Sequence, residues 1–406
     1  MPQSRRWADL PSDLLRRISD SLDLKCYANA RGSCTTWRCT LAPPSPSLLL
    51  ILDDGATCRM SVASLPARRS FELKAIPRRR RCFGSSNGWL ALTLYVYHDQ
   101  IMFILFNPIT GTEIALPPLV YNSTRPSKLV FAPGPASDDF AAAAICDVDR
   151  LAYVIGGARR WAILGPVHLA AGDHFVDIVY HEKGRVYCLT HYGDVKVLSL
   201  PERCRQEPAM VDDPSSVPAI PPLASPAQRA SLAIGRAQQE GDMRLRRSLG
   251  LDLNASAAVA EFDHAASFAP PYDTLSVFTS AKNLVFCEGN LYQIWRNASC
   301  TVTVRLPGGG HRRVVENEVF VLRYYPRRQP CWHAATDLGE YSVFVGRSNA
   351  VAMYAQGVPG LKGNCVYWIG GRGSDQGMAF DMETGRSTPC LPTAVGVAPQ
   401  RIFGWY

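Results

Sequence analysis

One short motif in the sequence has the spacing of a catalytic serine. Residues 84–88 read Gly-Ser-Ser-Asn-Gly, which matches the G-x-S-x-G pattern of hydrolases, where the central serine sits on a strained turn between a strand and a helix. Here four arginines and Cys82-Phe83 precede the motif, and a β-branched and aromatic run follows it. This order of elements is the wrong one for a nucleophilic Ser86, so we interpret the motif as a turn that opens a β-sheet unit.

Other residue types that catalyse reactions or hold metals are scattered. The sequence contains no P-loop, no HExxH, no EF-hand loop and no CxxC pair, and the closest cysteines, Cys34 and Cys39, have no histidine near them. Four of the eight histidines lie loosely together in sequence but lack i, i+4 spacing: His168, His174, His181 and His191. We expect His181 and His191 to lie at solvent-facing turns, and we predict no catalytic residue, no metal and no cofactor.

Length and composition indicate a multidomain globular chain. The 406 residues are too many for one ordinary core, and 47% of them are hydrophobic. The longest purely aliphatic run, residues 48–52, is far shorter than the ~20 residues of a membrane span. No secretory signal follows Met1, and the 13 cysteines form no dense framework. These features predict reduced thiols and a cytoplasmic or nuclear location, without membrane attachment.

The net charge of +8 is modest for this length. It gathers in three arginine clusters, at residues 78–81, at 244, 246 and 247, and at 327–328. No aromatic-flanked basic stripe accompanies them, so we interpret the clusters as solvated loops and do not expect nucleic-acid binding.

The elements at the N-terminus follow a helical pattern. Residues 10–13, Leu-Pro-Ser-Asp, suit the first turn of a helix, and Leu14, Leu15, Ile18 and Leu22 then form one apolar stripe. A second short helix is expected to end at Gly32, and Ser33 is expected to cap a third helix that carries Trp37. Such a small helical unit is marginal alone, so its leucines need either a partner protein or the following domain to cover them.

Two stretches of this helical unit resemble the F-box. They are residues 7–18, Trp-Ala-Asp-Leu-Pro-Ser-Asp-Leu-Leu-Arg-Arg-Ile, and residues 34–38, Cys-Thr-Thr-Trp-Arg, which stand at F-box spacing. The resemblance implies docking on the Skp adaptor, and through it on cullin, of a Skp–cullin–F-box ubiquitin ligase. The adaptor-binding residues that it implies are Leu10, Pro11, Leu14, Leu15, Ile18 and Leu22, with Trp37 as either a contact or an internal support.

From residue 48 onward short strand patterns dominate. Three-strand meanders are predicted over residues 89–116 and 175–200, and further strand pairs over 283–295 and 364–381, with turns such as Asn-Pro-Ile-Thr-Gly at 107–111 between strands. Repeated antiparallel units favour a propeller or a sandwich. At ~45 residues per four-stranded blade, the region outside residues 203–272 gives six or seven blades.

The order and spacing of several stretches resemble a group of plant F-box proteins whose C-terminal region is a kelch-like β-propeller, long filed as a domain of unknown function. These stretches are residues 84–90, 106–111, 116–119, 177–187 and 359–364. We therefore predict an all-α F-box of three helices at 1–47 and an all-β propeller at 48–406. The resemblance implies recruitment of a partner and does not imply catalysis.

Residues 203–272 lie outside this resemblance. They are rich in proline, alanine, serine and charge, and predict a disordered insert. Within it, Leu249, Leu251 and Leu253 form an L-x-L-x-L pattern that resembles the plant repression motif, which binds corepressor grooves.

Three functions remain open from sequence. The first is a substrate-recognition subunit of the ubiquitin ligase, with no active site of its own, which binds the adaptor through the helices and a target protein through the propeller. The second is a propeller enzyme, for which the sequence shows no convergent titratable residues. The third is an F-box-like scaffold or transcriptional repressor that acts through the 249–253 leucines without ubiquitination.

Overall fold

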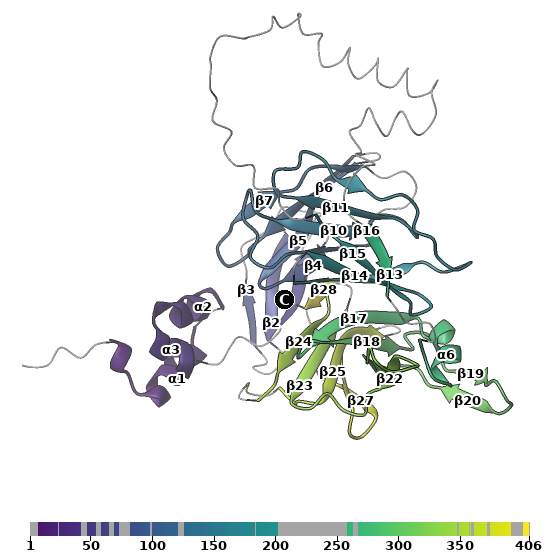
Figure 1. Ribbon diagram of the computed structural model, residues 1–406. Coiled ribbons are helices and arrows are strands. Elements are labelled where there is room, and N and C mark those ends of the chain that lie inside the picture. The colour runs from purple at the N-terminus through teal and green to yellow at the C-terminus, as the bar shows by residue number, and fades with distance from the viewer. Residues whose placement is uncertain are drawn as a thin grey trace, which may run out of the picture.

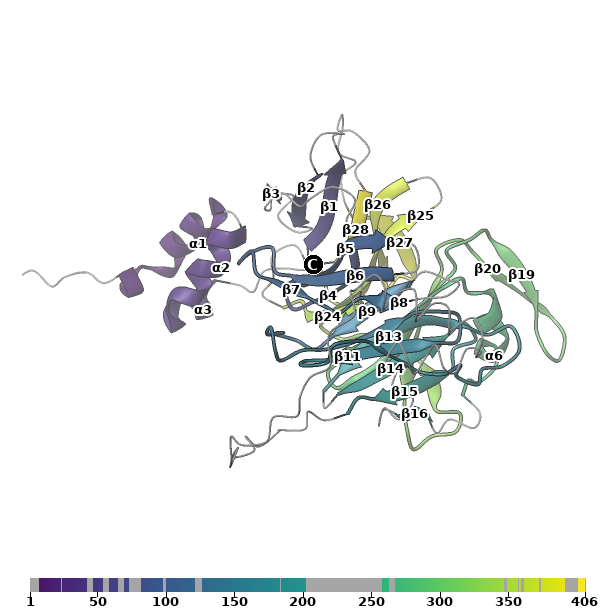
Figure 2. The ribbon, with the colours of Figure 1, turned by 90° about the horizontal axis from the view of Figure 1, so that it is seen from above.

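The structure is a computed structural model. It describes residues 7–22, 24–41, 47–53, 58–64, 69–72, 82–97, 100–120, 126–182, 184–201, 258–262, 267–346, 349–356, 358, 361–371, 374–390 and 401–405. In this part of the chain a small helical module is followed by a region made almost wholly of strands, and both views show the helices standing apart from the sheets (Figures 1 and 2). None of the described helices has the length and apolar character needed to cross a membrane.

The helical module has a 3-10 turn and three helices: η1 (Trp7–Asp9), α1 (Ser12–Asp20), α2 (Leu24–Ser33) and α3 (Thr35–Thr40). Pro11, with φ near −54°, precedes α1, so its missing N–H falls where no helical partner exists. The predicted cap of α3 was wrong by one residue. Helix α2 runs through Gly32 to Ser33, and the Cys34 Sγ accepts the Trp37 N–H at 3.4 Å in place of a Ser33 hydroxyl.

The described strands form six sheets of four or five strands, which lie beside one another in the β region (Figure 1), and one separate two-stranded hairpin. The first sheet joins β28 (Arg401–Trp405), β1 (Ser47–Asp53), β2 (Cys58–Ser64) and β3 (Arg69–Glu72). The second contains β4 (Cys82–Ser86), β5 (Trp89–Tyr97), β6 (Gln100–Phe106) and β7 (Glu113–Ala115), with β8 (Leu119–Val120) also on β6. The third is β9 (Lys128–Phe131), β10 (Ala141–Ile145), β11 (Leu151–Ile155) and β12 (Ala162–Ile163).

The remaining sheets lie later in the chain. The fourth is β13 (Phe175–His181), β14 (Arg185–Thr190), β15 (Val195–Ser199) and β16 (Ala258–Glu261). The helical turns α6 (Tyr272–Leu275) and η2 (Ser276–Phe278) lead to the fifth, which is β17 (Ala281–Cys287), β18 (Asn290–Arg296), β21 (Val319–Tyr324) and β22 (Trp332–Ala334). A separate hairpin of β19 (Val302–Arg305) and β20 (His311–Val314) leaves this sheet between β18 and β21.

The sixth sheet contains β24 (Val351–Tyr354), β23 (Tyr341–Val345), β25 (Cys365–Gly371), β26 (Ser374–Asp381) and β27 (Arg386–Pro389). Its β23 runs parallel to β25, whereas the other strand pairs of the described chain are antiparallel.

The terminal strands of successive sheets contact one another in the order β28, β4, β9, β13, β17 and β24. The two ends of the β region meet in one sheet, because β28 pairs with β1. Asn349, in the segment between β23 and β24, donates a hydrogen bond from Nδ2 to the Ser85 carbonyl at 2.7 Å, which links the sixth sheet to the second. These contacts arrange the sheets around one centre, as in a propeller.

The predicted strand pairs are confirmed, and one predicted boundary is corrected. The meanders at 89–116 and 175–200 appear as β5–β7 and β13–β15, and the pairs at 283–295 and 364–381 as β17–β18 and β25–β26. The disordered insert was predicted to end at residue 272, but β16 lies inside that range and pairs with β15 to complete the fourth sheet. Residues 258–260, Ala-Val-Ala, pair with β15 as the edge strand of this sheet, although the alanine-rich composition continues into them from the preceding segment.

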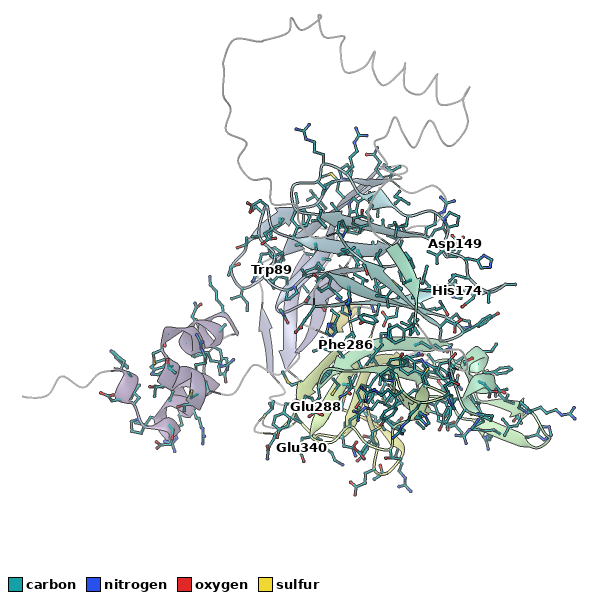
Figure 3. All side chains as sticks on the ribbon, in the orientation of Figure 1. Trp89, Asp149, His174, Phe286, Glu288 and Glu340 are labelled. Carbon is teal, nitrogen blue, oxygen red and sulfur yellow. The ribbon has the colours of Figure 1, made fainter. Side chains whose placement is uncertain are left out.

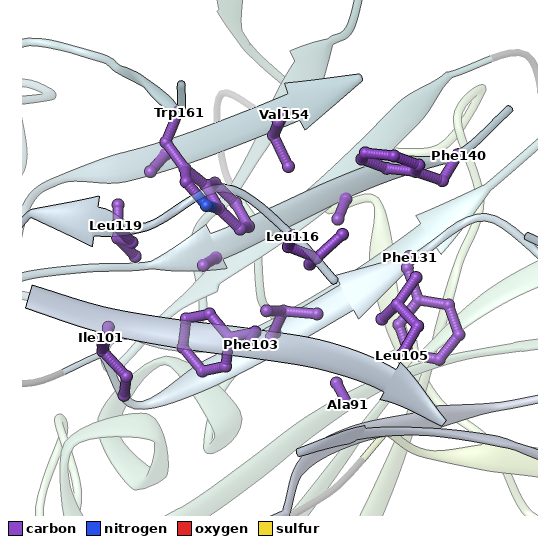
Figure 4. Close-up of a cluster of buried hydrophobic side chains, with 14 of the residues drawn as sticks. Ala91, Ile101, Phe103, Leu105, Leu116, Leu119, Phe131, Phe140, Val154 and Trp161 are labelled. Atoms are coloured by element: carbon purple, nitrogen blue, oxygen red, sulfur yellow. The ribbon is translucent and has the colours of Figure 1, made fainter. Parts of the chain in front are cut away.

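Buried hydrophobic residues fill the space between neighbouring sheets. Figure 4 shows one such cluster between the second and third sheets, in which Phe103 and Trp161 meet edge to face with ring centroids 6.2 Å apart. The Trp161 indole N–H donates to the Pro117 carbonyl at 2.8 Å, so the polar edge of this buried ring is satisfied. Four tryptophans are buried in these clusters: Trp161, Trp295, Trp332 and Trp368.

A buried ionic group joins three sheets near their inner strands. Asp177 on β13 and Lys128 on β9 form an ion pair, and both residues are almost fully buried. The Asp177 carboxylate also accepts the Leu284 N–H of β17 at 2.7 Å and the Ile178 N–H at 2.9 Å. Burial raises the pKa of Asp177 despite these partners. The pair and its backbone donors connect β9, β13 and β17, and so fix the positions of three successive sheets relative to one another.

Candidate functional site

The apolar stripe of α1 divides into an inner and an outer part. Leu15 is 1% exposed and forms the core of the helical module with Ala30 and Leu41. Leu14 and Ile18, one helical turn apart, are 43% and 38% exposed. Because residues i and i+4 lie on the same side of a helix, these two side chains form one apolar ridge on the outside of the module. No described strand covers this ridge in either view (Figures 1 and 2).

The other predicted adaptor-binding residues lie around this ridge. Pro11 is exposed at the start of α1, and Leu10 is half-buried beside it. Leu22 packs against the module core and is half-buried. Leu15 is the most deeply buried of the predicted contacts: sequence spacing put it on the same stripe as Leu14, but its side chain lies inside the module. Leu15 supports the ridge from inside and has no surface to offer a partner.

Trp37 acts as an internal support. Its ring packs against the module core, and its indole N–H donates to the Trp7 carbonyl at 3.0 Å, which ties η1 to α3. Nearby, the Arg31 Nε donates to the Leu41 carbonyl at 3.1 Å and so holds the end of α3. These contacts are those of an internal support, which is one of the two roles that sequence allowed for the half-buried Trp37.

Sequence reasoning missed one exposed residue of this site. Trp7 is 77% exposed, the most exposed of the large hydrophobic residues with described side chains, and it lies on η1, which Trp37 holds in place. Trp7 therefore adds a large aromatic side chain to the exposed apolar surface of the helical module. The signal was present in the sequence, because Trp7 is the first residue of the F-box-like stretch.

The G-x-S-x-G motif forms a β-hairpin. Ser86 ends β4 and pairs directly with Trp89 of β5, and the two residues between them, Asn87 and Gly88, have φ values of 46° and 79°. Positive φ at both central positions is the signature of a type I′ hairpin turn, which Asn-Gly favours. The motif therefore lacks the following helix of a nucleophile elbow, and the interpretation as a turn that opens a sheet is confirmed.

The first glycine of that motif has a packing role. A Cβ atom at Gly84 would lie 1.9 Å from the carbonyl oxygen of Leu129 on β9. The absent side chain therefore lets β4 and β9 approach each other, which fixes the contact between the second and third sheets.

The four histidines do not converge on one site. His174, labelled in Figure 3, stacks on His191 with ring centroids 5.0 Å apart. The His181 ring packs edge to face against Phe286 with ring centroids 3.8 Å apart, and His168 is exposed. His191 lies in a turn as expected, His181 ends β13, and both side chains are half-buried, which lowers the pKa of each imidazole. A group of three or more histidine, cysteine or acidic side chains suited to a metal is not found within the described ranges.

Close to these histidines lies a buried lysine. Lys282 is 4% exposed, donates to the Thr279 carbonyl at 3.0 Å and to the Ser276 carbonyl, and lies over the Trp295 ring with its Nζ 5.0 Å from the centroid. Its burial lowers its pKa to about 7. The carbonyls and the ring contact the ammonium but carry no full negative charge. Burial therefore outweighs the attraction of Asp173, and the folded protein disfavours the charged form of Lys282.

Several predictions from sequence concern residues outside the described ranges. These are the arginines at 78–81 and at 244, 246 and 247, the insert over 203–257, and within it Leu249, Leu251 and Leu253. None of the cysteines whose side chains are described forms a disulfide.

Comparison with known families covers both parts of the chain. Residues 7–45 match the F-box domain, and residues 61–390 match the KIB1-4 beta-propeller. The fold and the helical site therefore define an F-box protein whose second domain is a β-propeller. The chain belongs to the KIB1-4 beta-propeller family. No curated protein sequence matches it significantly.

Solved structures with a similar arrangement are distant in sequence. The chain is similar to Sqt1 of Saccharomyces cerevisiae, with 8% identity, a TM-score of 0.34, and coverage of 85% of this chain and 71% of that one. It is also similar to a putative 6-phosphogluconolactonase of Bacteroides uniformis, with 8% identity, a TM-score of 0.35, and coverage of 84% and 90%. Likenesses at this level carry no assignment of function.

Proposed function

We propose that this chain is the substrate-recognition subunit of a Skp–cullin–F-box ubiquitin ligase. In this proposal the helical module docks on the Skp adaptor, and the propeller holds a target protein. The observation that carries the proposal is the apolar ridge of Leu14 and Ile18, which stays open while Leu15, its neighbour on the same helix, is sealed inside. A helix that buries only half of its apolar stripe within its own domain leaves the other half for a second protein.

The mechanism requires no catalytic residue on this chain. An adaptor at one end and a target at the other would place target lysines near a conjugating enzyme and raise their effective concentration there. The residues proposed to contact the adaptor are Leu10, Pro11, Leu14 and Ile18, joined by Trp7. Leu15, Leu22 and Trp37 shape this surface from beneath. The lack of disulfides among the described cysteines supports a cytoplasmic or nuclear site of action.

A pull-down with purified Skp adaptor tests this proposal. We expect the full chain to bind and the Leu14→Asp and Ile18→Asp variants to lose binding, because a carboxylate buried without a partner in an apolar interface costs several kcal/mol. Both side chains are more than one-third exposed in the free protein, so both variants should fold. Arg16→Asp is the matched control, since Arg16 is exposed on the opposite side of α1, and it should bind like the wild type. Failure of the wild type to bind, or equal binding by the aspartate variants, would refute the proposal.

A further inference from the structure

The β19–β20 hairpin has a surface that adaptor docking does not use. Both views show the hairpin reaching outward from the fifth sheet, away from the helical module (Figures 1 and 2). At its tip, Gly308, Gly309 and Gly310 all have positive φ, and a side chain at any of them would meet no atom within 4 Å. The hairpin therefore projects into open space.

The hairpin has two chemically distinct faces. One face is anchored to the protein: Val304 and Val314 are buried, and Arg312 lies over the Phe320 ring and pairs with Glu318 at 2.9 Å. Strand register places Thr303 opposite Arg313 and Arg305 opposite His311, so these four residues share the other face. All four are exposed.

The outward face is cationic and unpaired. The side chains of Arg305, His311 and Arg313 make no hydrogen bond or ion pair within the part of the chain that the structure describes. Arg312, by contrast, has a carboxylate partner on the anchored face. The surrounding residues 283–334, which leave out the buried Lys282, hold seven arginines against three glutamates, a net charge of +4 compared with +8 for the whole chain. This part of one blade therefore has a positive field that attracts acidic groups.

The hairpin also has open strand edges. Strands β19 and β20 pair with each other and with no other described strand, so each keeps one edge of backbone N–H and C=O groups without a strand partner. Along β20, His311 and Arg313 are two residues apart, which separates them by about 7 Å. Alternate side chains of a strand laid beside β20 would have the same spacing.

We propose that the outer edge of β20 binds an extended acidic segment of a partner protein by strand addition. Main-chain hydrogen bonds would hold the segment, and acidic side chains at alternate positions would face Arg305, His311 and Arg313. This inference rests on the proposed receptor function in taking the segment to belong to a target protein. The open backbone edge of β20 favours a peptide over a single-stranded nucleic acid, because a peptide backbone can complete its main-chain hydrogen bonds.

The probe is a fluorescein-labelled peptide of alternating glutamate and threonine, titrated with the full chain at low salt and followed by anisotropy. We expect the double variant Arg305→Glu/Arg313→Glu to bind at least about tenfold more weakly than the wild type, because repulsion replaces attraction at both ends of the face. The matched control is Arg159→Glu/Arg160→Glu, an equal charge change at two exposed arginines between β11 and β12, which should bind like the wild type.

Two further ligands complete the experiment. The same peptide with N-methyl groups on alternate backbone amides should lose binding, since it cannot donate to a strand edge, and an oligothymidylate of equal charge should bind more weakly than the acidic peptide. Equal binding by the two arginine double variants, undiminished binding of the N-methylated peptide, or tighter binding of the oligonucleotide would each overturn the inference. The Arg305→Glu/Arg313→Glu variant should still capture the Skp adaptor, so a failure here is separable from a failure of the proposed ligase role.

Discussion

The buried pair of Lys128 and Asp177 gives the sharpest test of how the propeller is held together. Replacing Asp177 with alanine removes the only carboxylate that contacts the Lys128 ammonium among the described residues, and it also removes the acceptor of the Leu284 N–H. Lys128 is 4% exposed and Asp177 is fully buried, so water cannot replace the lost partner without local opening. Breaking a buried ion pair from one side costs about 3–5 kcal/mol, and we expect Asp177→Ala to lower the free energy of unfolding by that amount.

The assay is urea unfolding of the full chain at pH 7, followed by the fluorescence of the buried tryptophans. Lys128→Met, Asp177→Leu and the double variant complete a cycle. The double variant should be far more stable than the sum of the two single losses predicts, because an apolar pair leaves no buried charge. Asp149→Ala is the matched control: Asp149, labelled in Figure 3, has a half-exposed carboxylate 4.0 Å from its neighbour Arg150, and its loss should cost less than about 1 kcal/mol.

Two results would refute this reasoning. One is a loss below about 1 kcal/mol for Asp177→Ala, which would show that solvent reaches the Lys128 ammonium in the folded state. The other is strict additivity of the two single variants, which would show that the pair does not act as a unit.

Three further predictions concern other residues of the structure. Gly84→Ala should destabilise the protein by about 2–3 kcal/mol in the same urea assay, because its Cβ would overlap the Leu129 carbonyl. Gly165→Ala, where no atom lies within 4 Å and φ is ordinary, should stay within about 0.5 kcal/mol of the wild type; equal effects would contradict the packing argument. For Lys282, whose pKa falls to about 7 on folding, the unfolded chain binds one more proton between pH 7 and its ordinary pKa, so wild-type stability should rise with pH relative to Lys282→Met by at most about 1.4 kcal/mol per unit. Unfolding curves of both proteins at pH 7 and 8.5 measure this difference, in which the contribution of the thiols common to both cancels. Parallel pH profiles would be inconsistent with a buried neutral lysine. Trp37→Phe keeps an aromatic side chain but loses the indole hydrogen bond to η1. The Skp adaptor should therefore bind this variant several-fold more weakly in a titration, while the helical circular dichroism is unchanged. Unaltered affinity would show that η1 does not contribute to docking.

Local patterns in the sequence predicted most of the elements. Proline before Ser12, the leucine spacing of α1 and the Asn-Gly pair at 87–88 each specify a conformation over a few residues, because helix entry and type I′ turns depend on local dihedral angles. The meanders were equally readable, since antiparallel neighbours are adjacent in sequence. The cap of α3 and the end of the insert were misplaced, because both depend on which of two neighbouring segments finds a tertiary partner.

The candidate site was predictable in its location and only partly in its composition. Sequence spacing puts Leu14, Leu15 and Ile18 on one apolar stripe. It does not show which of these side chains the module buries in its own core. Packing against Ala30 and Leu41 decides that Leu15 turns inward. The position of Trp7 is fixed by a hydrogen bond from the Trp37 indole, thirty residues later in the chain, to the Trp7 carbonyl.

By itself, the sequence determined that a short helical unit precedes a series of antiparallel strands, and it located the F-box-like residues, because these properties follow from periodicity and turn chemistry within a few residues of each position. Only the tertiary structure decided that β28 closes the first sheet beside β1, that Asp177 joins three sheets, and that Arg305, His311 and Arg313 share one open face. These relations join residues that are distant in the chain, or depend on which hairpin face is buried, and no local preference encodes them.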